Sequence, residues 1–186
     1  MADIIYALEK LWDVEYSSQP ARFLHKNKNE DGYTLGGIYQ KYHSTSIDWN
    51  FVNKIMEACN NSITRASRML FYDLEIQTQI RTIYLNEYWH KMKLDRVKSQ
   101  DVANNIFLFG VVSGVRNASK QVQKVLEVEQ DGIIGNITLE RLNSIDPDLF
   151  NSLFDLSEIK YFENLVATNS ELSVFLSGWK NRAMYV

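Results

Sequence analysis

Apolar residues recur every three or four positions along most of this chain, a spacing that places them on one face of an α-helix. In the first such segment, residues 3–14, they occupy positions 4, 5, 8, 11 and 12. Similar patterns predict further helices over residues 35–43, 51–56 (capped by Ser46 or Asp48), 62–72, 74–92, 101–126, 147–167 and 171–184. Two Pro and eight Gly interrupt the pattern little. We therefore expect a mainly α-helical fold.

The predicted helix 101–126 is the longest, and its part between residues 106 and 114 is apolar on almost every side. A helix without a polar face is typical of the centre of a fold. Gly110 and Gly114 lie four residues apart and would let a neighbouring helix approach closely. We expect this segment to be a buried central helix around which the others pack.

Glu15 comes at the end of the first predicted helix, directly before a long polar loop over residues 17–32. The negative end of the helix dipole opposes a second negative charge there, which favours the protonated carboxyl. An acid that keeps its proton near neutral pH is what cleavage of a glycosidic bond requires. A solvated Glu in a frayed last turn fits the same spacing, so spacing alone leaves both readings open.

Length, composition and charge limit the other possibilities. The 186 residues, 45% apolar and 23% charged, are enough for one well-buried globular domain, with room for a small subdomain. A net charge of −3, with no stripe of Lys and Arg interleaved with aromatics, argues against a nucleic-acid partner. The single cysteine, Cys59, cannot form an internal disulfide, and we expect it to be a small buried apolar residue.

No metal, cofactor or membrane segment is expected. His25 lies in the polar loop with no second His or Cys at ligand spacing, and we interpret it as a surface residue. The first residues have no basic region followed by a continuous apolar run, and no later run approaches the ~20 apolar residues of a membrane span. We therefore expect synthesis in the bacterial cytoplasm without a signal peptide, and no insertion into a membrane.

The N-terminal motifs resemble those of the glycoside hydrolase family 108 muramidases. That family carries Glu-Gly-Gly-Tyr and then Asp-Pro-Gly-Gly-x-Thr-Asn-x-Gly-Ile-Thr. Here the first motif reads Glu15-Tyr16-Ser17-Ser18, without the glycines, and the second reads NEDGYTLGGIY over residues 29–39. In an ungapped match Asn29 stands where the family has Asp, with Glu30 and Asp31 directly after it.

Three further segments extend the resemblance to nearly the whole chain. The aromatic patch with Tyr84, Tyr88 and Trp89 matches a Tyr-Trp pair of the family. Residues 121–139 are similar to the Gln-x-x-Leu and Asp-Gly-x-x-Gly-x-x-Thr motif of peptidoglycan-binding domains, although they also read as a structural turn. Residues 175–182 resemble the family's Phe-x-x-Gly-Trp-x-Asn-Arg ending. In contrast, Leu108 and Val112 replace polar residues that related muramidases carry in the central helix.

The resemblance implies a lysozyme-like helical fold that hydrolyses the β-1,4 bond between N-acetylmuramic acid and N-acetylglucosamine. Residues 1–95 would be the muramidase region, and residues 96–186 a peptidoglycan-binding region packed against it in one compact unit. Glu15 would be the general acid, assisted by a carboxylate from Glu30 or Asp31. The residues expected to contact substrate are Thr34, Tyr39, Tyr84, Tyr88 and Trp89; for the last three, packing in the core is an equal alternative to sugar stacking.

The implied partner is the glycan strand of peptidoglycan, reached in the periplasm or cell wall with the help of a holin or a secretion apparatus, and we expect a monomer. Two other functions fit the same residues. A lytic transglycosylase keeps the Glu acid but replaces water with a hydroxyl of the substrate. A non-catalytic wall-binding or secretion accessory protein is favoured by the missing glycines after Glu15 and by Asn29. The sequence leaves open whether the setting is phage lysis or secretion.

Overall fold

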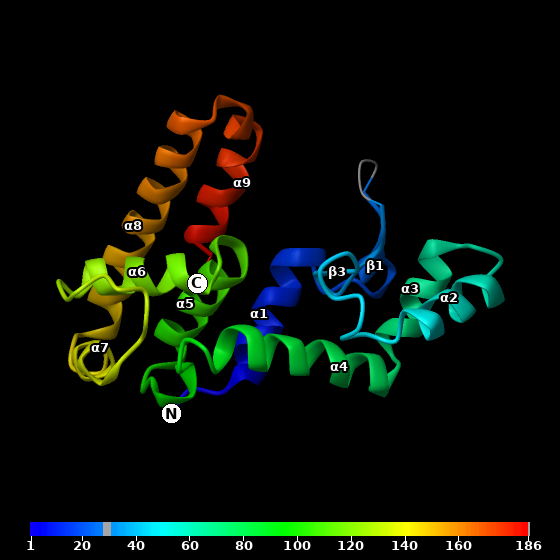
Figure 1. Cartoon of the computed structure of the whole chain (residues 1–186), viewed down its shortest axis with the longest axis horizontal. Helices are drawn as coiled ribbons and strands as arrows, with labels where there is room; N and C mark the ends of the chain where they lie inside the picture. The colour runs from blue at the N-terminus through cyan, green and yellow to red at the C-terminus, as the bar shows by residue number, and fades with distance from the viewer. Residues whose placement is uncertain (28–30, 186) are drawn as a thin grey trace. The chain divides into compact units, whose positions relative to one another are not determined.

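The computed structural model describes residues 1–27 and 31–185 (Figure 1). The structure is 67% helical with one small sheet, which confirms the mainly α fold. The chain forms two compact units, the N-terminal unit (Leu8–Leu85) and the C-terminal unit (Met1–Ala7 with Asn86–Val186). These are units of packing, and the predicted division of function between residues 1–95 and 96–186 stays a prediction.

The described residues of the N-terminal unit form four α-helices, two of which begin at a capping Asp side chain. They are α1 (Ile4–Tyr16, from Leu8 onward), α2 (Trp49–Ala58), α3 (Ile63–Phe71) and α4 (Leu74–Tyr84). The side chain of Asp48 accepts a hydrogen bond from the Phe51 amide, and that of Asp73 accepts one from the Ile76 amide. Such contacts satisfy amides that the first turn of a helix leaves without partners.

A small antiparallel sheet stands where the sequence predicted a helix over residues 35–43. Its strands are β1 (Leu24–His25), β2 (Thr34–Leu35) and β3 (Ile38–Tyr39), in that order, and the turn η1 (Pro20–Arg22) precedes them. The helix prediction is wrong because Gly36 and Gly37 have φ values of 55° and 85°, which place the backbone in the left-handed region. Two such residues close a tight hairpin between β2 and β3.

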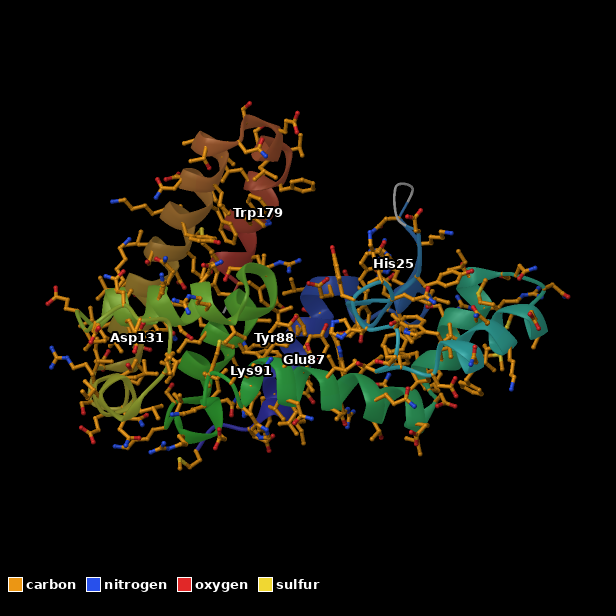
Figure 2. All side chains as sticks on the ribbon, in the orientation of Figure 1. His25, Glu87, Tyr88, Lys91, Asp131 and Trp179 are labelled. Atoms are coloured by element: carbon orange, nitrogen blue, oxygen red, sulfur yellow. The ribbon has the colours of Figure 1, made fainter. Side chains whose placement is uncertain are left out.

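The C-terminal unit is built from a run of helices that ends in an antiparallel pair. Its elements are η2 (Leu85–Trp89), η3 (Leu94–Arg96), α5 (Gln100–Ser113), α6 (Val115–Val125), α7 (Asn136–Leu142), α8 (Pro147–Thr168), η4 (Ser170–Leu172) and α9 (Ser173–Ala183). Helices α8 and α9 lie side by side (Figure 1). The Trp179 ring of α9 stacks on Phe162 of α8 at 4.8 Å between centroids (Figure 2).

The predicted single helix over residues 101–126 is in fact two helices. The chain breaks at Gly114, whose φ of 86° and ψ of 148° cannot continue an α-helix. Helix α5 is buried from Val102 to Gly110 and is the central helix of this unit. The close crossing expected at the glycines is wrong at Gly114, where a Cβ would meet no atom of the described residues within 4 Å. At Gly110 another helix does come close, because a Cβ there would lie 3.6 Å from the Ala118 Cβ of α6, and it would also collide with the Met92 side chain.

Helix α8, with 22 residues, is the longest helix in the described part of the chain. Charged residues are spread along it, including Asp155, Glu158 and Lys160. Over residues 1–27 and 31–185, no helix combines the length and the apolar character needed to cross a membrane.

Candidate functional site

Glu15 lies in the last turn of α1, as the hydrophobic pattern predicted. The next residue anchors the helix end: the Tyr16 ring is buried and makes edge-to-face contacts with Phe23 at 5.6 Å and Phe71 at 6.4 Å. Because the side chains at consecutive helix positions point about 100° apart, an inward Tyr16 leaves Glu15 at the margin of the core. Glu15 is half-buried there.

Glu15 lines a surface pocket of about 320 Å³ in the N-terminal unit. The opposite lining comes from η1 and β1, with Arg22 and His25 as its polar members. Figure 2 shows His25 at the base of the loop. A carboxyl group beside a guanidinium and an imidazole offers a proton donor and several hydrogen-bond donors to a polar ligand. A larger pocket, of about 380 Å³, lies in the C-terminal unit, so the chemistry of the lining, rather than volume, identifies this site.

The Gly36–Gly37 turn lies against the Glu15 side chain. A Cβ built on Gly37 would be 3.8 Å from the Glu15 Cγ and would collide with the Tyr84 hydroxyl. That hydroxyl donates a hydrogen bond of 3.0 Å to the Gly36 carbonyl. Helices α1 and α4 therefore hold the turn from two sides, and only glycine fits at its second position.

The structure places Thr34 and Tyr39 opposite each other on the hairpin that carries this turn. Thr34 is buried in β2 and also pairs with His25 of β1. Tyr39 is half-buried, and its ring makes an edge-to-face contact with Tyr42 at 5.5 Å. The sheet thus joins both residues to the strand that lines the Glu15 pocket.

The predicted second carboxylate falls in the least described part of the chain. Asn29 and Glu30 lie outside the described residues, and Asp31 is exposed at the edge of that gap. The expected pairing of Glu15 with Glu30 or Asp31 stays a prediction.

Two of the predicted aromatic substrate contacts are packed in the interior. Tyr84 is 1% exposed in the N-terminal unit, and Trp89 is 2% exposed against Phe107 in the C-terminal unit. Tyr88 is half-buried, and this burial, together with the Glu87 carboxylate, raises the pKa of its hydroxyl. A ring without an exposed face offers no surface to a sugar. The burial of Tyr84 and Trp89 therefore favours the alternative of core packing, while their contact with substrate stays a prediction.

Sequence reasoning missed two residues of the pocket and one anchor. The sequence predicts an irregular polar loop that contains Arg22 and His25, but it does not predict that both line a surface pocket with Glu15. The available signal was the segment Phe23-Leu24-His25, in which two apolar residues precede a polar one at the start of a strand. No sequence signal identifies the hydrogen bond from Tyr84 to Gly36.

The Asp-Gly motif of the C-terminal unit forms a tightly bonded turn (Figure 2). The buried Gln123 side chain donates to Asp131 at 2.6 Å and to the Ile133 carbonyl at 3.0 Å, and accepts from the Gly132 amide at 2.8 Å. The hydrogen bond from Gln123 is the main reason that the pKa of Asp131 lies below its usual range. The motif therefore has a structural role, the alternative that the sequence left open.

Over the described residues 1–27 and 31–185, no three His, Cys, Asp or Glu side chains gather as a metal ion would need.

Comparison with known proteins finds two family matches in this chain. The family model described as Glycosyl hydrolase 108 matches residues 21–114, about half of the 186 residues. The one described as Predicted Peptidoglycan domain matches residues 117–184. The first match begins after Glu15, so it does not by itself assign that residue a role. A comparison with curated proteins gives no match.

Among solved structures, that of SagA from Brucella abortus is similar, with a TM-score of 0.61. The two sequences are 19% identical, and the alignment covers 97% of this chain and 93% of SagA. At this identity the similarity establishes a shared fold over nearly the full length of both chains.

Proposed function

We propose a specific reaction from one premise, that the chain belongs to the Glycosyl hydrolase 108 family. It is therefore a glycoside hydrolase, and with its peptidoglycan domain it is a peptidoglycan hydrolase. The proposed reaction is that of a lysozyme-type N-acetylmuramidase, hydrolysis of the β-1,4 bond between N-acetylmuramic acid and N-acetylglucosamine.

Glu15 is the proposed general acid, and its position is the observation that carries the proposal. It lies at the end of a helix, half-buried, in a pocket lined with hydrogen-bond donors. Its carboxyl would protonate the glycosidic oxygen as the bond to the muramic acid anomeric carbon breaks, so the sugar leaves as a neutral alcohol. The Gly36–Gly37 turn against its Cγ supports this role, because a fixed acid transfers its proton more efficiently than a freely rotating one.

A second carboxylate is proposed to act from the loop before β2. Asp31 or Glu30 would orient the attacking water or stabilise the positive charge that develops on the sugar ring. The separation of the two carboxyl groups would decide the stereochemistry, roughly 5–5.5 Å for retention and roughly 6.5–9.5 Å for inversion.

The sugar ring next to the broken bond is proposed to lie along η1 and β1. Arg22 and His25 can donate hydrogen bonds to hydroxyl and acetamido oxygens there. Thr34 and Tyr39 would shape the floor of the site from the neighbouring strands. The peptidoglycan domain at residues 117–184 would hold the polymer while the N-terminal residues cut it.

Product analysis on purified peptidoglycan tests the proposal, with Glu15→Gln compared against Glu9→Gln. Glu9 is an exposed carboxyl on the same helix, so its substitution controls for the loss of one charge from α1. We expect the parent and Glu9→Gln to release fragments with reducing N-acetylmuramic acid ends. Glu15→Gln should be slower by about 10²–10⁴-fold at unchanged circular dichroism.

Other results of the product analysis would favour a different function or a different acid. Anhydromuramic acid ends would identify a lytic transglycosylase instead of a hydrolase. Equal turnover by Glu15→Gln and the parent would reject Glu15 as the acid. No soluble product from the folded parent protein on several wall types would favour the non-catalytic wall-binding function.

A further inference from the structure

A second pocket, of about 380 Å³, lies within the C-terminal unit and contains no part of the Glu15 site. One wall runs from Arg96, the last residue of η3, to Lys98, with the extended Val97 between them. The other wall is a single face of α7, formed by Asn136, Leu139, Glu140 and Asn143, residues spaced three or four apart. Neither the sequence motifs nor the family descriptions assign this pocket a role.

The two cationic side chains of the pocket point the same way because the residue between them is buried. Val97 is 1% exposed and has extended backbone angles, φ −79° and ψ 135°. Successive side chains of extended backbone point to opposite sides, so an inward Val97 turns both Arg96 and Lys98 outward. They line the pocket together.

Hydrogen bonds from α7 fix this segment in place. The Asn143 side chain accepts from the Lys98 amide at 2.8 Å and donates to the Arg96 carbonyl at 3.0 Å. The Asn136 side-chain oxygen accepts from the Arg96 guanidinium at 3.3 Å. The backbone of residues 96–98 and the Arg96 guanidinium are therefore held relative to α7 before any ligand arrives, which lowers the entropy cost of binding.

The side chains that line the pocket carry one net positive charge. Arg96 and Lys98 face a single carboxyl of the lining, Glu140. Over residues 1–27 and 31–185, neither cation has a carboxylate within ion-pair distance. A guanidinium has five N–H donors, of which Asn136 uses one. Such a group beside an ammonium is suited to a carboxylate, which can accept two hydrogen bonds from the fork of Arg.

We propose that this pocket binds a free carboxylate of the peptide stem that is attached to N-acetylmuramic acid. The inference rests on the proposed function and extends it from the glycan to the peptide. The sugars of the glycan carry no free acid, because the lactyl carboxyl of muramic acid is used in the amide bond to the stem. The anionic groups of the polymer are therefore the carboxylates of the stem. A pocket that is open at the surface is accessible to them.

Calorimetry with the full chain tests the proposal using two product-sized ligands. One is a disaccharide that carries a tetrapeptide stem, and the other is the same disaccharide with a methylamide on its lactyl carboxyl in place of the stem, so that it carries no free carboxylate. Neither contains a bond for a muramidase to cut, so the parent protein is used without loss of ligand. We expect only the stem-bearing ligand to bind in this pocket. Its affinity should fall with added salt, and it should bind more weakly when the stem carboxylates are amidated.

Four variants separate this pocket from general charge effects. Arg96→Gln should weaken binding of the stem-bearing ligand about tenfold, since hydrogen bonds to charged groups are the strong ones, and Lys98→Gln should weaken it less. Glu140→Gln should strengthen binding a few-fold, because it removes the one negative charge of the lining. Lys124→Gln is the matched control, because Lys124 is an exposed cation of the same unit outside the pocket.

The inference would be overturned if both ligands bound equally or if neither bound. It would also be overturned if Lys124→Gln had as large an effect as Arg96→Gln, or if Glu140→Gln left the affinity unchanged. Cleavage of peptidoglycan without stem-dependent binding would overturn the inference alone. Stem-dependent binding by a protein that cuts no glycan would overturn the proposed function alone.

Discussion

The hydroxyl of Tyr84 donates a hydrogen bond of 3.0 Å to the carbonyl of Gly36, across 48 positions of the sequence. This bond ties the buried end of α4 to the turn of the β2–β3 hairpin. The next residue of that turn, Gly37, lies against the Glu15 side chain. A contact deep in the N-terminal unit therefore sets the position of the proposed acid.

Tyr84→Phe tests this relationship with a loss of one oxygen atom. We expect a fall in the free energy of unfolding of about 1–2 kcal/mol, because the Gly36 carbonyl loses a buried donor. Turnover of peptidoglycan should fall several-fold as the turn shifts against Glu15. Denaturant unfolding and wall lysis on the same preparation measure both effects. Tyr42→Phe is the control, since Tyr42 is 77% exposed, and it should change neither quantity.

The glycines offer a graded series in which backbone strain and steric contact are separated. Gly37→Ala combines a positive φ of 85° with a collision with the Tyr84 hydroxyl, whereas Gly114→Ala has a positive φ of 86° with open space among the described residues around it. Left-handed backbone costs about 1–2 kcal/mol for a residue with a Cβ. Gly178→Ala, inside α9 and without near neighbours, should stabilise by about 0.5–1 kcal/mol.

The expected order of unfolding midpoints is therefore Gly178→Ala highest, then the parent, then Gly114→Ala, with Gly37→Ala lowest. Activity should be lost only in Gly37→Ala. A Gly37→Ala protein as stable and active as Gly114→Ala would mean that the turn relaxes away from Tyr84 at no cost.

Helical periodicity predicted most elements of this fold, and the failures have identifiable physical causes. The segments that form α1, α3, α8 and α9 keep a regular apolar spacing. Helices α1, α3 and α8 contain no glycine, and the glycine of α9, Gly178, has open space around it. The hairpin at Gly36 and the break at Gly114 were missed because glycine adopts positive and negative φ with similar ease, so the residue type does not fix the backbone angle. Periodicity in the residues alone does not reveal a positive φ.

The residues of the candidate site also differ in whether the sequence alone could predict them. Glu15 could be found because its signal is local, a carboxyl at the end of a helix before a polar loop. Arg22 and His25 join it only after the loop folds into η1 and β1, so their proximity is a tertiary fact. The burial of Tyr84 and Trp89 is likewise decided by what surrounds them, which is why an aromatic patch could be read equally as a sugar platform or as core.

Glu158 makes the stability of the C-terminal unit depend on pH. This residue is 3% exposed, and its Oε1 has no hydrogen-bond partner among the residues that the structure describes. Burial, and to a lesser degree the Asp155 carboxylate, raise its pKa from 4.5 to about 9. Between these values the folded protein holds a proton that the unfolded chain has released. Stability is therefore greatest below about pH 4.5 with respect to this group and falls as pH rises towards about 9.

Glu158→Gln removes this titration and should flatten the fall in stability between pH 5 and 9. At pH 7 the variant should be more stable than the parent by up to about 3 kcal/mol. Glu129→Gln, which changes an exposed carboxyl of the same unit, should keep the slope of the parent. Urea unfolding at a series of pH values measures how the free energy of unfolding of each protein depends on pH. Parallel curves for Glu158→Gln and the parent would show that the buried carboxyl does not titrate in this range.

Because Gln123 bonds to the Asp131-Gly132 turn, replacing the nitrogen of its side-chain amide by an oxygen is expected to destabilise the turn. In Gln123→Glu, a carboxylate oxygen replaces the amide nitrogen that donates to Asp131 at 2.6 Å and to the Ile133 carbonyl. At pH 7 two negative charges would then face each other where one donor and one acceptor stood. At pH 4 the pair can share a proton, so the variant should recover part of its melting temperature on acidification.

In the parent, the contribution of Asp131 to stability is expected to change in the opposite direction with pH, separately from that of Glu158. The pKa of Asp131 is lowered in the folded state, chiefly by the Gln123 hydrogen bond, so this group stabilises the fold above its unfolded pKa and loses that contribution as pH falls. Gln130→Glu places the same new charge on an exposed side chain next to Asp131 and serves as the control. Thermal melts at pH 4 and pH 7 compare the three proteins. If Gln123→Glu and Gln130→Glu melt together at pH 7, the bonds from Gln123 do not hold the turn.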